Sequence, residues 1–238
     1  MVKLQTENEY YILYSPDTLK YITDTMEKIL IDSFEKYKEI FNVDDYRQIQ
    51  INFFDNIEDF RNYILSMRED KESLPSYAKG TFDNGMINAF IESNISINSE
   101  EYNRKLYMAS HELFHIMYLE LILKNDYSKR ITWFDEGMAQ YLSGEKDYLK
   151  DKAKFKTFIE KVIKETKDIP NLNFLSHDAN FCNDNYNGYD LSFIAIKYII
   201  EELHKEKIYY LLSDFDKILY YGNNVLFDAL EYYKKIIY

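Results

Sequence analysis

The sequence His111-Glu112-Leu113-Phe114-His115 places two of the chain's four histidines four residues apart, with a glutamate beside the first. On a helix, residues four apart project from one face, so both imidazoles can reach a single metal ion. A carboxylate next to them can take a proton from a water molecule held on that ion. The pattern therefore predicts a helix here, with His111 and His115 as metal ligands and Glu112 as general base.

A zinc site of this kind needs a third protein ligand and an open fourth position for water. A third histidine a few residues on would lie near position 121, which is Leu121 instead. The segment 132–141, TWFDEGMAQY, offers a carboxylate from a second helix, and Glu136 is the predicted third ligand. Asp135 has two interpretations: it orients a ligand histidine through a hydrogen bond, or it is a solvated acid at the start of a helix.

These residues resemble the gluzincin metallopeptidases, the group that contains thermolysin and the aminopeptidase N relatives. In particular, the chain resembles the bacterial peptidase MA-like domains, where a tryptophan precedes an E-G-x-A-x-Y run. The matching residues are Trp133, Glu136, Gly137, Ala139 and Tyr141. The spacer is slightly longer than in the best-known gluzincins, and a turn over 124–130 would absorb the difference. The resemblance implies Zn²⁺ as cofactor, peptide-bond hydrolysis and a thermolysin-like α+β fold.

The resemblance also implies a catalytic tyrosine at the start of a later helix. In aminopeptidase-type gluzincins this tyrosine is followed, after two intervening residues, by a small residue and then by an apolar run. Tyr189, Ser192 and the run to Ile200 match that pattern. Its hydroxyl would donate a hydrogen bond to the oxyanion, which is typically worth about 3–4 kcal/mol of barrier. His177 and Tyr186, in the preceding loop, remain alternative donors.

The order of the predicted elements favours the same α+β class. Residues 1–98 alternate strand-like and helix-like segments and predict a small mixed sheet with helices. Residues 99–238 are predicted to be mainly helical and to carry the zinc site, within a single domain and with a cleft between the two parts. The helices expected in the chain cover about 15–41, 57–67, 101–124, 134–142, 146–166, 189–203, 208–219 and 225–237.

A strand expected from Met86 to Ile91 is the candidate substrate edge, at Ile87, Asn88 and Ala89. Gluzincins bind the peptide as an added strand, which recognises its backbone more than its side chains. The stretch from Gly85 to Ala89 resembles the G-x-M-x-N aminopeptidase motif only out of register. It also lacks the glutamate that recognises a free amine, so the sequence favours an endopeptidase.

Composition narrows the range of partners. The 29 basic and 41 acidic residues give a net charge of −12, which disfavours nucleic acid and anionic membranes. The single cysteine, Cys182, excludes an internal disulfide. No apolar run reaches the roughly 18 residues of a membrane span, and the start of the chain lacks the apolar core of a signal peptide. We therefore expect a cytoplasmic protein that acts on a peptide or protein substrate.

Two other functions fit the same residues. The chain could be a catalytically inactive binding module that keeps the gluzincin scaffold. It could also be a regulatory protease that cuts a single target. A Glu112→Gln variant separates the first alternative from catalysis, and digestion of mixed peptides separates the second from a broad peptidase.

Overall fold

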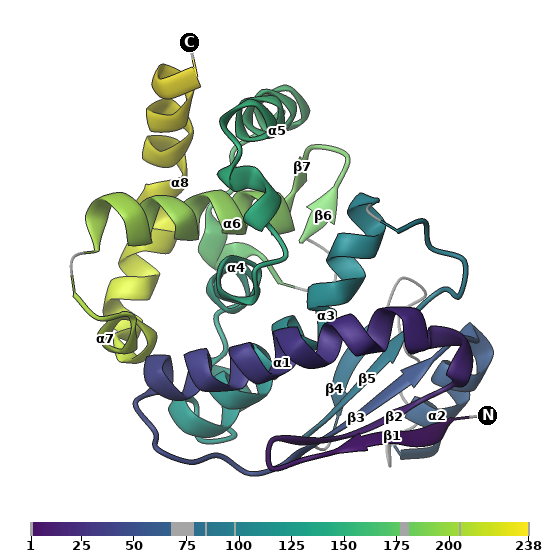
Figure 1. Ribbon diagram of the computed structural model, residues 1–238. Helices are drawn as coiled ribbons and strands as arrows, with labels where there is room; N and C mark the ends of the chain where they lie inside the picture. The colour runs from purple at the N-terminus through teal and green to yellow at the C-terminus, as the bar shows by residue number, and fades with distance from the viewer. Residues whose placement is uncertain are drawn as a thin grey trace. The chain divides into compact units, whose positions relative to one another are not determined.

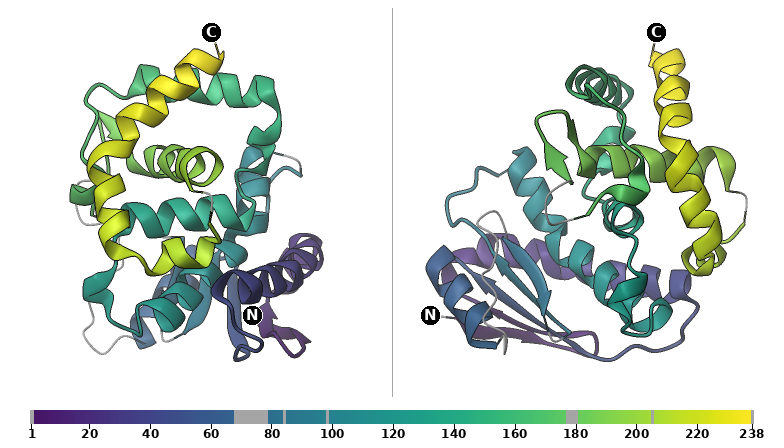
Figure 2. Two further views of the ribbon diagram at one scale, coloured as in Figure 1. Left: turned by 90° about the vertical axis from the view of Figure 1, so that its left-hand side faces the viewer. Right: turned by 180° about the vertical axis from the view of Figure 1, so that it is seen from behind.

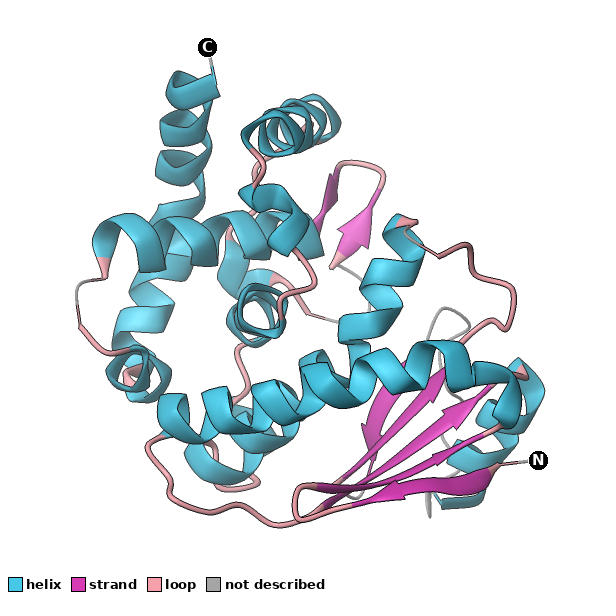
Figure 3. Ribbon diagram, viewed as in Figure 1, coloured by secondary structure: helices cyan, strands magenta, loops and turns pink. Residues whose placement is uncertain are grey.

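Figure 1 shows the computed structural model, which describes residues 2–67, 79–83, 85–97, 99–176, 181–204 and 206–237. The chain divides into two compact units, Met1–Met117 and Tyr118–Tyr238. Strands lie mainly in the first unit, whereas the second is mainly helical (Figure 3). The predicted α+β class is therefore confirmed. The sequence predicts a division between a sheet-containing part, 1–98, and a helical part, 99–238. The boundary between the two compact units lies later, because the helix with the H-E-x-x-H motif belongs to the first unit.

The first unit is built on a five-stranded mixed sheet in the order β1-β2-β3-β5-β4. Its strands are β1 (Lys3–Glu7), β2 (Tyr11–Ser15), β3 (Ile49–Phe54), β4 (Gly80–Asp83) and β5 (Met86–Phe90). Three helices accompany them, α1 (Lys20–Phe41), α2 (Ile57–Met67) and α3 (Glu100–Met117). β2, β3 and β5 run parallel, and β1 and β4 run antiparallel to their neighbours. Within the described residues, β4 forms one edge of the sheet and β5 lies inside it.

Successive side chains of a strand point to opposite faces, so each face of this sheet packs against a different helix. Phe54 of β3 contacts Phe60 and Tyr63 of α2, with ring centroids 5.9 and 5.2 Å away. On the other face, Tyr11 of β2 stacks on Phe34 of α1 at 6.3 Å. Burial on both faces agrees with the mostly apolar sequences of β3 and β5, whose polar residues are Gln50, Asn52 and Asn88.

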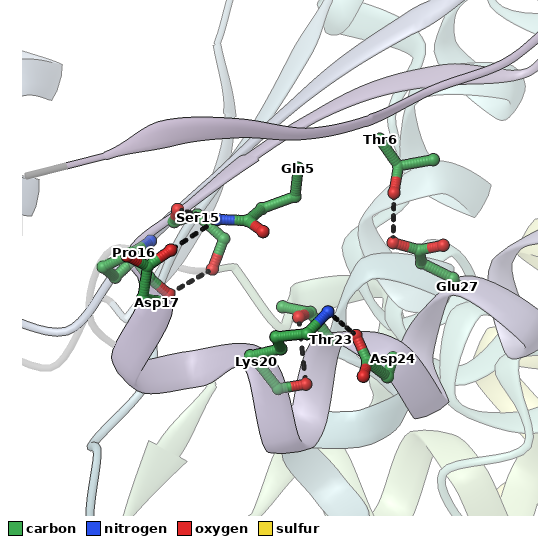
Figure 4. A network of polar contacts seen from close by, with 9 residues as sticks. All are labelled: Gln5, Thr6, Ser15, Pro16, Asp17, Lys20, Thr23, Asp24 and Glu27. Atoms are coloured by element: carbon green, nitrogen blue, oxygen red, sulfur yellow. Dashed lines mark hydrogen bonds and ion pairs between the residues drawn. The ribbon is translucent and has the colours of Figure 1, made fainter.

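Side-chain contacts fasten the edge strand β1 to its neighbours (Figure 4). Gln5 Nε2 donates to the carbonyl oxygen of Ser15 at 2.9 Å, next to the start of α1. Thr6 Oγ1 donates to a carboxylate oxygen of Glu27, which lies in α1. The side chains of β1 are largely exposed, so burial contributes little to holding this strand in place. The polar contacts of Gln5 and Thr6 fix it at the edge of the sheet.

The second unit consists mainly of helices around α6. Its helices are α4 (Thr132–Ser143), α5 (Lys152–Glu165), α6 (Gly188–Tyr198), α7 (Ile208–Ser213) and α8 (Phe215–Ile237). A small hairpin of β6 (Cys182–Asn183) and β7 (Tyr186–Asn187) precedes α6. α6 packs against both α4 and α8 (Figure 2). No helix in the described part of the chain is long and apolar enough to cross a membrane.

Shorter helical segments modify several of the expected helices. The π-helical segments are Tyr118–Ile122 and Ile199–Leu203, and the 3₁₀ turns are Asp17–Leu19, Tyr127–Lys129, Asp147–Lys150 and Leu172–Phe174. The expected division of the last helices into 208–219 and 225–237 is wrong. α7 ends at Ser213, and α8 then runs without a break from Phe215 to Ile237.

Candidate metal centre

The H-E-x-x-H motif lies in the last turns of α3, as the sequence predicts. The rings of His111 and His115 lie edge to face, with centroids 4.7 Å apart. His115 is almost fully buried, and His111 and Glu112 are half-buried. The helix therefore presents both imidazoles on one face, within reach of the same ion.

The opposite face of α3 is fixed against α1 by polar and aromatic contacts. The hydroxyl of Ser110, which directly precedes His111, lies 2.8 Å from that of Ser33 and 3.0 Å from that of Tyr37. The ring of Phe114 packs on Tyr37 at 5.8 Å. One contact directly precedes the motif and the other lies within it, so they set the rotation of α3 about its axis and with it the direction of the histidines.

The edge strand β4 borders the motif. A Cβ atom at Gly80 would lie 3.0 Å from Glu112 Oε1, and the ring of Phe82 lies 5.4 Å from that of His115. The expected substrate edge at Ile87, Asn88 and Ala89 is wrong in this respect, because those residues belong to β5, which is paired with β3 and β4. The backbone edge beside Glu112 is that of β4.

In the second unit, Glu136 lies in the second turn of α4 and is 5% exposed. Arg130 Nη2 donates to Glu136 Oε1 at 3.0 Å, and Arg130 Nε donates to Asp135. A buried carboxylate is costly unless its charge is paired, and the guanidinium supplies that pairing for both acids. Asp135 is 2% exposed, so the interpretation as a solvated acid is wrong. Its action on a ligand histidine stays a prediction.

Arg130 is a site residue that sequence reasoning missed, since it was assigned to the turn over 124–130. Lys129 and Arg130 are both basic, and nothing local distinguishes the half-buried Arg130 from the exposed Lys129. The available signal was the spacing from Arg130 to two acids, Asp135 and Glu136, across the beginning of a helix. The contact becomes evident only in the structure, where the chain passes from the 3₁₀ turn into α4 and the guanidinium of Arg130 reaches both carboxylates.

Tyr189 occupies the first turn of α6. Asn187 begins that helix by accepting hydrogen bonds from the backbone N–H of Tyr189 at 3.0 Å and of Asp190 at 3.4 Å. Gln140 of α4 donates to the carbonyl oxygen of Tyr189 at 3.0 Å. The tyrosine is therefore well positioned by its backbone, but its catalytic role stays a prediction. Of its rivals, Tyr186 lies in β7, and His177 lies outside the described residues.

A buried lysine lies on the same helix as the motif. Lys105 is 2% exposed, and burial lowers its pKa from 10.5 to about 8. Below pH 8 the amine is protonated both in the folded and in the unfolded protein, so folding bears the cost of burying the charge. Between pH 8 and 10.5 only the folded protein loses the proton, and this cost disappears.

We therefore expect Lys105→Met to raise the free energy of unfolding at pH 7 by about 1–3 kcal/mol. The advantage of the variant should shrink between pH 8 and 10.5, because the wild type gains stability in that window. Urea denaturation of both proteins at several pH values measures the difference. A variant that is less stable at pH 7 would show that the amine's hydrogen bond outweighs its desolvation.

Histidine and carboxylate side chains of the described residues include a group that could hold a metal ion, formed by His111, His115 and Glu136. These are the three ligands predicted from the sequence. Two imidazoles and one carboxylate are a donor set that suits zinc.

The fold is similar to that of a solved structure, the aminopeptidase N family protein from Idiomarina loihiensis, with a TM-score of 0.51. The two sequences are 13% identical, and the similarity covers 92% of this chain and 42% of that protein. The chain thus spans less than half the length of the relative in structure. No protein-family model and no curated protein sequence matches the chain. The resemblance in fold to aminopeptidase N relatives, expected from the sequence, is confirmed.

Proposed function

We propose that the chain is a zinc-dependent peptidase in which His111, His115 and Glu136 hold the metal. The observation that carries the proposal is the His/His/Glu group itself, with a glutamate next to its first histidine. His115 and Glu136 are nearly fully buried, and a buried site strengthens the attraction between a cation and its ligands. Arg130 keeps the carboxylate of Glu136 in a fixed position, as outer partners of metal ligands do.

Zinc bound there would lower the pKa of a water molecule toward 7 and polarise the substrate carbonyl. Glu112 takes the proton from the attacking water and passes it to the leaving nitrogen. The Tyr189 hydroxyl donates a hydrogen bond to the oxygen that becomes negative as the carbonyl carbon is attacked.

The proposed substrate is an extended peptide that adds to the edge of β4. Within the described residues this edge has no partner strand, so its backbone groups can pair with a peptide. Gly80 brings the backbone of β4 close to Glu112, since a Cβ atom at Gly80 would lie 3.0 Å from Glu112 Oε1. Backbone pairing does not require a free amine, and the out-of-register aminopeptidase motif lacks the glutamate that would bind one. We therefore propose an endopeptidase.

Metal content tests the ligand set. We expect about one zinc per chain in the wild type and at least about 100-fold weaker binding in Glu136→Gln, since loss of even an outer partner costs 10–100-fold. The measurement is inductively coupled plasma mass spectrometry on tag-free protein, followed by titration with a competing chelator.

Glu165→Gln is the matched control, because this acid is exposed on α5. Its zinc content should equal that of the wild type. A well-folded wild type that takes up no zinc, even when zinc is supplied, would overturn the peptidase proposal. Full zinc affinity in Glu136→Gln would remove Glu136 from the ligand set.

A further inference from the structure

Lys105 of α3 is a buried cation to which the mechanism gives no role. Its ammonium group carries three N–H donors. It donates to the carbonyl oxygen of Phe90 at 3.1 Å and weakly to Met108 Sδ at 4.0 Å. No carboxylate of the described residues lies within ion-pair distance of it. A buried charge with unused donors is unfavourable unless something pairs with it. The lysine is therefore suited to bind an anion that is not part of the chain.

The position of Lys105 connects it with the proposed general base. Residues 105, 108 and 112 lie on one side of α3, because they are three and seven apart. Lys105 Nζ lies 4.0 Å from Met108 Sδ. A Cβ atom at Gly80 would lie 3.5 Å from that sulfur and 3.0 Å from Glu112 Oε1. Going from Glu112 toward the start of the helix, the chain thus presents a carboxylate, then a thioether, then an ammonium group.

The direction of β4 tells which side of the scissile bond faces Lys105. The carbonyl oxygen of Phe90 accepts the hydrogen bond from Lys105. The N–H of Phe90 donates to the carbonyl oxygen of Lys79 at 2.7 Å. Lys79 directly precedes Gly80, so Lys105 lies near the beginning of β4 and beyond Glu112. In a peptide that pairs antiparallel to β4, the residues after the scissile bond lie beside the beginning of β4. Those residues, on the leaving-group side, lie next to the lysine.

We propose that Lys105 is a specificity-determining residue that binds a substrate carboxylate on the C-terminal side of the scissile bond. The inference rests on the proposed peptidase function. The carboxylate comes from an aspartate or glutamate side chain or from the free C-terminus of a short peptide. Met108 gives the stem of that residue an apolar contact, and the ammonium group forms a charge-assisted hydrogen bond with its end.

The electrostatic surroundings agree with this role. Burial lowers the pKa of Lys105 to about 8, with smaller decreases from the charges of Lys79 and Arg104 and increases from Glu101 and Glu92. At pH 7 the amine is therefore mostly protonated and poorly solvated. A carboxylate that binds there meets a cation that has already lost its water, so less solvent has to be displaced.

The test uses peptides identical except for the residue after a cleavage point that mass spectrometry has established. With glutamate at that position, kcat/KM of the wild type should exceed the value with glutamine by about 10- to 100-fold, the usual range for a hydrogen bond to a charged group. In Lys105→Met the ratio should fall to about one. Lys79→Met is the matched control, because Lys79 is a nearby but partly exposed lysine paired with Glu92, and it should keep the wild-type ratio.

A second pair of peptides, one with a free and one with an amidated C-terminus, distinguishes a terminal carboxylate from an acidic side chain. A glutamate-to-glutamine ratio near one in the wild type, with no preference for the free acid, would overturn the inference and leave the peptidase standing. So would a preference that Lys105→Met retains.

Absence of any Glu112-dependent cleavage is a failure of the proposed function instead. In that case the role of Lys105 is tested by calorimetric binding of peptides that differ only in glutamate or glutamine at one position, or in a free or amidated C-terminus. Tighter binding of the carboxylate peptides that is lost in Lys105→Met supports the site, and equal binding of all peptides overturns it.

Discussion

Replacement of Glu112 by glutamine is expected to reduce kcat for peptide hydrolysis by about 10²–10⁴-fold, the usual contribution of general acid–base catalysis. Glutamine has the shape of glutamate, but its amide cannot take a proton from water. The side chain is half-buried, beside Gly80 and on the same helix as His111 and His115. An isosteric change there preserves packing, so zinc content and the denaturation midpoint should stay at the wild-type values.

The measurement combines hydrolysis of a defined peptide with metal analysis of the same sample. Glu165→Gln, on the exposed side of α5, controls for the loss of one negative charge. Full hydrolysis by Glu112→Gln would show that another group moves the proton. If instead hydrolysis is lost but binding of a biological partner and its effect persist, the chain acts as a binding module, the first alternative that the sequence left open.

The parts of the site that could be predicted are those encoded locally. His111, Glu112 and His115 are fixed relative to one another by the helix alone, and α3 has the helical spacing that the motif requires. Lys105 could not be recognised in this way. Its neighbour Arg104 is ordinary for a solvated helix, and the burial of Lys105 beside Phe90 is evident only in the structure.

The sheet shows the same limit. The helix Ile57–Met67 follows from its own apolar pattern and is found where it is expected. β4 has four residues, Gly80–Asp83, and its pairing with β5 makes it a strand. The sequence pattern does not predict this strand, and without it β5 becomes the edge of the sheet. The error moved the expected substrate edge by one strand.

The course of α8 depends on a contact that the sequence does not reveal. A Cβ atom at Gly222 would lie 2.0 Å from Asn173 Oδ1, and Asn173 Nδ2 donates to the carbonyl oxygen of Leu219 at 2.8 Å. The glycine is therefore a packing position inside the helix and not its end. The actual start of α8 does have a local signal, because Asp214 accepts a hydrogen bond from the N–H of Lys217 at 3.0 Å.

Gly137 links the sequence motif of α4 to the packing of the second unit. The resemblance matched this glycine without a physical reason for it. A Cβ atom at Gly137 would lie 2.6 Å from Ile196 Cγ1 and 2.7 Å from the carbonyl oxygen of Ser192, both in α6. The glycine therefore allows α4 and α6 to approach closely. Helix propensity alone favours alanine over glycine by about 1 kcal/mol, so packing and propensity predict opposite signs for Gly137→Ala.

We expect packing to prevail and Gly137→Ala to lower the free energy of unfolding by at least about 2 kcal/mol. The Ser192 oxygen belongs to the backbone, so it cannot rotate away, and α6 has to shift. For the same reason, adding Ile196→Ala should not restore stability, although it removes the other close contact.

Trp133, the only tryptophan of the sequence, is fully buried in α4 and reports unfolding by fluorescence. Thr157→Ala, exposed on α5, controls for helix propensity. A Gly137→Ala protein as stable as the wild type would mean that α4 and α6 do not approach this closely, and the motif glycine would then need another explanation.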